Sequence, residues 1–231
     1  GGQTTSSLLN ARKKDKLSLD NIFVQLKLSE VSYDAATNLI PKIAEYSNTQ
    51  NKIAKSDFFS NHPFHQKMQV ISRRLLAPLK PEARINTKWY YERSRGQYQN
   101  ERLYLNDAAR SLLDSEFPFN QVINKTDLAK YDSSLREKPY WTSLGGDSNF
   151  SKFATLFSNK TSLSDADFWK SIEHNFDENY FKKIICIAIL WKKLEKLISD
   201  ARGDWYEGDY RAQIVTYTVS SFFYIIRSRG G

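Results

Sequence analysis

The segment FKKIICIAILWKKLEKLI, residues 181–198, has the most regular pattern of apolar residues in the chain and decides its fold class. Its apolar side chains recur at spacings of three, four and seven residues, which is the repeat of one face of an α-helix. The residues on this face are Ile184, Ile187, Ala188, Trp191, Leu194 and Ile198. We therefore predict a long amphipathic helix over residues 181–198.

A second apolar segment, residues 212–226, follows this helix. Its β-branched side chains, such as Val215 and Val219, favour a buried strand, whereas its length favours a helix. We predict a helix here, so that the C-terminal third of the chain is helical.

The rest of the chain contains shorter helix patterns and shorter strand patterns. Amphipathic spacing predicts helices over residues 39–46, 65–76 and 106–117. Side chains that accept hydrogen bonds from a first helical turn are expected at Asn106, Thr126, Ser164 and the hydroxyl run 4–7. Alternating or β-branched residues predict strands over 22–28 and 84–91.

These signals predict an α+β fold that is predominantly helical, with a small sheet and a helical C-terminal third. We expect a mixed α/β region over residues 1–160 and a helical region over 161–231, packed together as one unit.

Composition excludes several classes of protein. The 231 residues include 34 Lys and Arg against 26 Asp and Glu, a formal net charge of +8. A single cysteine, Cys186, excludes an internal disulfide framework, and we expect it in the core. The longest apolar run, residues 184–191, is far shorter than the roughly 20 residues that cross a bilayer. We therefore expect a protein of the cytoplasm without a membrane partner.

Catalytic groups are scarce in the sequence. No Asp or Glu is followed two residues later by Lys, so the chain lacks the carboxylate–lysine triplet of metal-dependent nucleases of the restriction type. His62 and His65 are three residues apart without an evident third ligand, so we predict no metal site. The catalytic residues, if the protein has any, stay unidentified.

Residues 67–102 mix basic and aromatic side chains. Cations hold phosphates and exposed aromatic rings stack on bases, which is the chemistry of nucleic-acid binding. The candidates for it are Arg73, Arg74, Lys88, Trp89 and Tyr91. The alternative interpretation is a solvated charged face with the aromatic rings in the core.

Two further segments are rich in amide and hydroxyl groups, and each of them is expected to open a helix. Donors of this kind at a helix N-terminus form a general phosphate site. The candidate phosphate- or nucleotide-binding residues are Gln3, Thr4, Thr5, Asn48, Gln50 and Asn51, with Arg93 and Arg95 of the Arg-x-Arg-Gly sequence. Our hypothesis requires all of them to face one pocket.

Several motifs, in this order, resemble the AIPR family of bacterial abortive-infection phage-resistance proteins. They are GGQTT (1–5), YSNTQNKI (46–53), DFFSNHPFH (57–65), WYYERSRGQY (89–98), NKTDLAKY (124–131), SLGGDSNFSKF (143–153) and YRAQIVTYTVS (210–220). The resemblance covers essentially the whole chain. It implies further protein before residue 1, often with a nuclease-like region, so that this chain is expected to be a fragment.

The order of GGQTTSSL and SNTQNKIAKSDF is also similar to motifs of ParB-like nucleotide-binding domains. The chain departs from them at Thr4, where those domains have Gln or Arg.

The resemblance implies an antiphage protein region that binds nucleic acid or a nucleotide through a polar and basic site. One alternative is a substrate clamp for a phosphodiesterase or NTPase whose catalytic centre lies upstream. The other is an oligomerisation module with Trp191, Leu194 and Ile198 exposed, so that the chain forms a homo-oligomer. No cofactor is expected in this chain itself, but a nucleotide or a divalent metal is expected to serve a longer protein.

Overall fold

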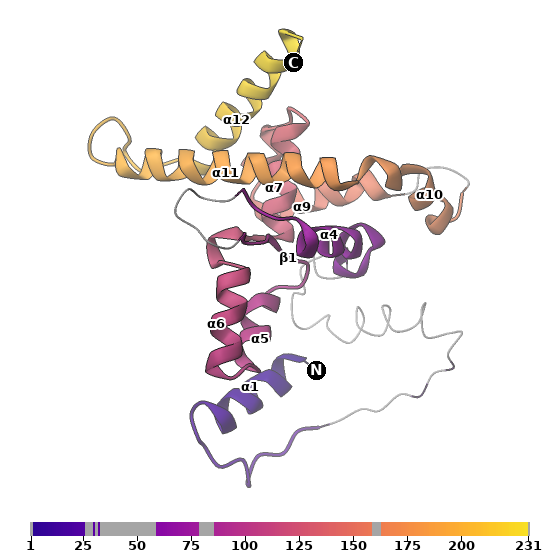
Figure 1. Cartoon of the computed structure of the whole chain (residues 1–231), viewed down its shortest axis with the longest axis vertical. Helices are drawn as coiled ribbons and strands as arrows, with labels where there is room; N and C mark the ends of the chain where they lie inside the picture. The colour runs from indigo at the N-terminus through magenta and orange to yellow at the C-terminus, as the bar shows by residue number, and fades with distance from the viewer. Residues whose placement is uncertain are drawn as a thin grey trace. The chain divides into compact units, whose positions relative to one another are not determined.

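The computed structural model describes residues 2–25, 30, 32, 59–78, 86–158 and 163–230. The chain divides into two compact units, residues 1–44 and residues 45–231, which are described separately here. Figure 1 shows the elements of both units.

The first unit contains the helix α1, Gly2–Lys13. Arg12 and Lys13 lie in its last turn, where cations interact favourably with the helix dipole. The helix begins at Gly2, so Thr4 and Thr5 lie within it and not in a preceding turn. The strand predicted over residues 22–28 is wrong in its described part, because residues 22–25 have no regular structure.

The second unit is built mainly from helices. Its first elements are the 3-10 helix η1 (Phe59–Asn61), α4 (Pro63–Arg74), β1 (Tyr90–Glu92), α5 (Gln97–Leu103), α6 (Asp107–Glu116), η2 (Phe119–Gln121) and β2 (Val122–Asn124). There follow α7 (Lys125–Leu135), α8 (Tyr140–Ser143), α9 (Gly146–Ala154), η3 (Thr155–Phe157), α10 (Asp165–Ile172), η4 (Glu173–Asn175), α11 (Glu178–Asp200) and α12 (Arg211–Ser228). β1 and β2 pair in parallel, with Tyr90 opposite Val122 and Glu92 opposite Asn124. The predicted fold class, predominantly helical with a small sheet, is confirmed.

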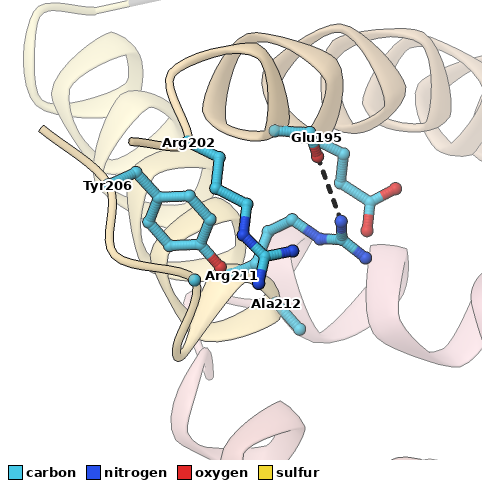
Figure 2. Close-up of a pocket in the computed structure, with 7 residues that line it drawn as sticks. Glu195, Arg202, Tyr206, Arg211 and Ala212 are labelled. Carbon is cyan, nitrogen blue, oxygen red and sulfur yellow. Dashed lines mark hydrogen bonds between the residues drawn. The ribbon is translucent and has the colours of Figure 1, made fainter. Parts of the chain in front are cut away.

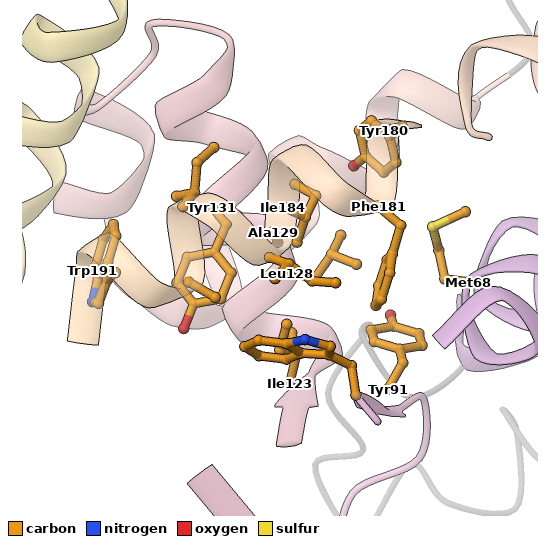
Figure 3. Packing of buried hydrophobic residues seen from close by; sticks show 14 of the residues in the cluster. Met68, Tyr91, Ile123, Leu128, Ala129, Tyr131, Tyr180, Phe181, Ile184 and Trp191 are labelled. Atoms are coloured by element: carbon orange, nitrogen blue, oxygen red, sulfur yellow. The ribbon is translucent and has the colours of Figure 1, made fainter. Parts of the chain in front are cut away.

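The long helix α11 forms one side of the core and packs against α7 (Figure 1). The predicted stripe on α11 is buried, apart from Leu194, which is partly buried against the same cluster. Figure 3 shows Ile184 and Trp191 packed with Leu128 and Tyr131 of α7. An oligomerisation surface made of Trp191, Leu194 and Ile198 is therefore not available in this structure.

Cys186 is exposed, and its predicted place in the core is wrong. The apolar run that contains it, residues 184–191, extends all round the helix, whereas only one face of the helix is buried. Cys186 lies two residues after Ile184, a rotation of about 200° around the helix axis, so it points away from the stripe.

α12 confirms the choice of helix over strand for residues 212–226. Val215 and Val219, four residues apart, are fully buried on one face. α12 packs against α11 and α7. The buried cluster thus joins residues from both sides of the predicted boundary at residue 160, and that boundary stays a prediction.

Phe64 lies at the centre of an aromatic cluster formed by α4, η1, α9, η3, α10 and α11. The centroid of its ring is 4.7 Å from that of Phe157, 5.1 Å from that of Phe176 and 5.4 Å from that of Phe153. The aromatic cluster comprises Phe59, His62, Phe64, His65, Phe150, Phe153, Phe157, Trp169, Phe176 and Tyr180. Edge-to-face pairs predominate in it, as the charge distribution of aromatic rings favours.

Helix boundaries follow the local capping groups. Asn106 and Ser164 cap α6 and α10 as predicted, because each side chain accepts a hydrogen bond from a backbone N–H three residues later. The predicted cap at Thr126 is wrong, since α7 begins earlier and Asn124 caps it. α4 spans Pro63–Arg74 and β1 spans Tyr90–Glu92, against the predicted 65–76 and 84–91. The helix predicted over 39–46 lies outside the described residues.

Substitution of Asn124 by alanine is expected to lower the free energy of unfolding by about 1–2 kcal/mol. Its Oδ1 accepts hydrogen bonds from the Asp127 backbone N–H (2.8 Å) and from the Thr126 hydroxyl (2.7 Å), and both are lost. Urea denaturation measures the change. Asn100→Ala, at an exposed site inside α5, is the matched control, and an equal loss in the two variants would contradict the capping role.

Among the helices of the described residues, none combines the length and the apolar character that a membrane crossing needs.

Candidate functional site

Two cationic side chains from separate segments meet at Ser60. We call His65, Arg93 and Lys125, together with Ser60 and Asn61, the basic cluster. Lys125 Nζ donates a hydrogen bond to Ser60 Oγ (2.7 Å), and Arg93 Nη1 donates to the Ser60 carbonyl oxygen (3.2 Å). Residues far apart in the sequence thus meet at one serine.

The parallel pairing of β1 and β2 explains this meeting. Glu92 and Asn124 are opposite each other at the last positions of the two strands. Arg93 and Lys125 are the next residues along each chain segment. Because parallel strands end at the same edge, their following residues emerge together, and that edge is where open α/β sheets place ligand sites.

Arg93 is held by neutral acceptors. Its Nε donates to Gln69 Oε1 (2.9 Å), and its Nη1 donates to Asn61 Oδ1 (2.7 Å) as well as to Ser60. No carboxylate is among these hydrogen-bond partners, so its positive charge is not neutralised by an ion pair within the described ranges. Arg93 is half-buried, and Asn61 beside it is exposed.

His65 lies behind these cations and is fully buried. Its Nδ1 is 2.5 Å from the hydroxyl of Tyr91, which is also buried. Burial, and to a smaller extent the charges of His62, Lys125 and Arg93, together lower the pKa of His65 to about 3. His65 is therefore neutral at pH 7. Its Nε2 is buried and has no hydrogen-bond partner among the described residues.

The Glu92 carboxylate, next to Arg93, organises the turn that carries Arg95. Its two oxygens accept hydrogen bonds from the backbone N–H groups of Gly96 (2.8 Å) and Tyr98 (3.2 Å). Gly96 has a φ of +76°, a conformation that glycine adopts without the steric cost of a side chain. The turn leaves the side chain of Arg95 exposed.

The five predicted nucleic-acid-binding residues divide into different environments. Trp89 and Tyr91 are buried in the core, so a stacking role for these two rings does not fit the structure. Lys88 forms an ion pair with Glu116 (2.6 Å). The guanidinium of Arg73 lies 3.3 Å from the centroid of the Tyr90 ring, and burial lowers the pKa of Arg73. Arg74 is exposed.

The other predicted phosphate-binding residues are not brought to this cluster by the described structure. Gln3, Thr4 and Thr5 belong to α1 in the first unit, whereas the basic cluster is in the second. Asn48, Gln50 and Asn51 lie outside the described residues. Their convergence with Arg93 and Arg95 stays a prediction.

Sequence reasoning did not select Ser60, His65 or Lys125 as binding residues. Ser60 and His65 belong to the DFFSNHPFH motif and Lys125 to NKTDLAKY, so the motifs themselves were the available signal. In the described part of the chain, no group of three or more His, Cys, Asp or Glu residues is placed to hold a metal ion. His62 instead caps α4, because its Nδ1 accepts a hydrogen bond from the Phe64 N–H (3.2 Å).

Comparison with known proteins identifies a family for the chain. No curated protein and no solved structure matches it. The family model described as AIPR protein matches residues 1–229, which is essentially the whole chain and includes every segment of the basic cluster. The chain therefore belongs to the AIPR family, the family named for abortive infection and phage resistance.

Proposed function

We propose that this chain binds a phosphate group of nucleic acid or of a nucleotide at the basic cluster, as part of an antiphage protein of the cytoplasm. The observation that carries the proposal is the meeting of Arg93 and Lys125 at Ser60, at the shared end of two parallel strands. A guanidinium and an ammonium beside hydroxyl and amide groups make up the donor set that recognises phosphate oxygens.

The accessible edge of the basic cluster is formed by Arg93 and Asn61. Lys125 and His65 lie deeper, where Lys125 supplies positive charge and the neutral His65 supplies hydrogen-bonding capacity. A phosphate at the edge would accept hydrogen bonds from Arg93 and lie in the positive field of Lys125. Burial is the largest cause of the lowered pKa of His65, and the charges of Lys125 and Arg93 act in the same direction.

Further exposed cations in the second unit could contact additional phosphates of a longer nucleic acid. Arg95 and Arg74 are exposed on the same segments that build the cluster, after β1 and at the end of α4. The net charge of the whole chain, +8, favours the binding of a polyanion such as nucleic acid. Sequence-independent binding through phosphates is then expected to weaken steeply with salt.

Substitution of Arg93 by alanine is expected to weaken nucleic-acid or nucleotide binding by about 10- to 100-fold, because hydrogen bonds to charged groups contribute about 1.5–3 kcal/mol. Fluorescence anisotropy with labelled single-stranded DNA, labelled RNA and a labelled nucleotide measures it at low and high salt. Arg93→Lys keeps the positive charge but loses the planar set of N–H donors of the guanidinium group, so we expect an affinity between those of the unmodified chain and Arg93→Ala.

The matched control is Arg229→Ala, which removes one exposed arginine from the end of α12. Thermal denaturation of each variant separates loss of binding from loss of structure. Equal weakening by the two alanine variants, or no binding of any probe by the unmodified chain at low salt, would refute the proposal.

A further inference from the structure

A cavity of about 440 Å³ lies at the end of α11. It is formed by other elements and other residues than the basic cluster. Figure 2 shows it between the last turns of α11, the following loop and the start of α12. Its lining residues are Glu195, Ser199, Arg202, Tyr206, Gly208, Arg211 and Ala212. A volume of this size suits a small molecule.

The loop that closes the cavity has a defined structure. The backbone N–H of Gly203 donates to the Tyr206 carbonyl oxygen (3.2 Å), and that of Tyr206 donates to the Ala201 carbonyl oxygen (3.3 Å). Tyr206 is buried against the core. These bonds fix the backbone on both sides of Arg202.

Gly208 lets the guanidinium of Arg202 lie close to the loop backbone. Its φ is +116°, and a Cβ built there would be 3.4 Å from Arg202 Nη2. The position therefore favours glycine for its conformation and for the close approach of Arg202.

The charges in the cavity are not balanced by ion pairs. Arg211 Nη1 donates to the Ser199 hydroxyl (3.0 Å), a neutral partner. Within the described ranges, the side chain of Arg202 forms no hydrogen bond or ion pair, and Glu195 forms no ion pair with either arginine. Figure 2 shows the two guanidinium groups pointing into the same space. Two guanidinium groups that line one pocket favour an anion between them.

We propose that this pocket binds a small phosphate monoester, with its phosphate held between Arg202 and Arg211. A phosphate monoester carries close to two negative charges at pH 7, which matches two guanidinium groups in charge and in hydrogen-bond geometry. Glu195 lines the same cavity and accepts hydrogen bonds only, so it is suited to a hydroxyl group of the same ligand. This site goes beyond the proposed function, because it shares no residue with the basic cluster.

Isothermal titration calorimetry of the whole chain with ribose 5-phosphate tests the proposal. Ribose lacks the phosphate and acetate carries a single charge, and both are expected to bind at least about tenfold more weakly. Inorganic phosphate is expected to bind more weakly than ribose 5-phosphate, because it offers no hydroxyl of a sugar to Glu195.

Arg202→Ala is the decisive variant, since the side chain of Arg202 makes no hydrogen bond within the described ranges that its loss would break. We expect it to reduce the affinity for ribose 5-phosphate at least about tenfold. Arg229→Ala is the charge-matched control and should leave that affinity unchanged. Circular dichroism of the variants confirms that the helices are intact.

Equal binding of ribose and ribose 5-phosphate, no measurable binding of ribose 5-phosphate, or unchanged affinity in Arg202→Ala would overturn the proposal. Arg93→Ala separates this site from the basic cluster. If Arg93→Ala abolishes binding of ribose 5-phosphate and Arg202→Ala does not, the pocket fails while the proposed function stands. If Arg202→Ala abolishes the binding of ribose 5-phosphate and Arg93→Ala does not, the pocket is supported, whether or not the chain binds nucleic acid.

Discussion

Replacing Phe64 by alanine is expected to lower the free energy of unfolding by about 3–5 kcal/mol, the range for removing a large aromatic side chain from a core. Phe64 is fully buried and contacts rings from η3, α9 and α11. Its removal would leave a cavity that these rings can fill only partly, since they are held by separate elements. Urea denaturation followed by circular dichroism measures the loss.

The matched control for this prediction is Leu112→Ala on α6. Leu112 is exposed over 68% of its surface, and both residue types favour a helix. We expect a change within about 0.5 kcal/mol there. Similar losses in the two variants would show that Phe64 does not hold the aromatic cluster together.

Acid is expected to destabilise the second unit well before its carboxylates are protonated. Burial lowers the pKa of His62 to about 4, against a smaller opposing effect of Asp165, and burial lowers that of His65 to about 3. In the unfolded chain both histidines have pKa values near 6.5. Below pH 6.5 the unfolded state therefore binds protons that the folded state does not.

The sign of the effect follows from this difference. The contribution of the two histidines is complete above pH 6.5 and is lost as the pH falls toward 4 for His62 and toward 3 for His65. Each one is expected to lower the free energy of unfolding by up to about 1.4 kcal/mol per pH unit. Urea denaturation at a series of pH values between 7 and 4 measures the slope.

His65→Gln removes one titrating group, so the slope should fall by up to about 1.4 kcal/mol per pH unit whatever the stability of the variant at pH 7. His174→Gln is the control, because His174 is exposed. A slope that His65→Gln leaves unchanged would mean that His65 is not buried in its neutral form.

The candidate site could be predicted from the sequence only in part. Arg93 was selected because Arg-x-Arg-Gly combines charge with a turn, and both are local properties. Lys125 and Ser60 were not selected, because within their motifs neither belongs to a charge run or a turn that indicates binding. They reach Arg93 through the pairing of β1 with β2, two three-residue strands separated by about thirty residues, of which only β1 overlaps a strand predicted from the sequence.

The sequence by itself determined the helices of the C-terminal third, the caps at Asn106 and Ser164, and the family. Each of these depends on residues near one another in the chain, because helical periodicity and capping act over one or a few turns. Only the tertiary structure decided which side chains meet and which face solvent. Trp89 and Tyr91 are buried although Arg95, a few residues later in the sequence, is exposed. Cys186 is exposed although it lies within an apolar run. Burial depends on which elements pack against a segment, and these elements come from distant parts of the chain.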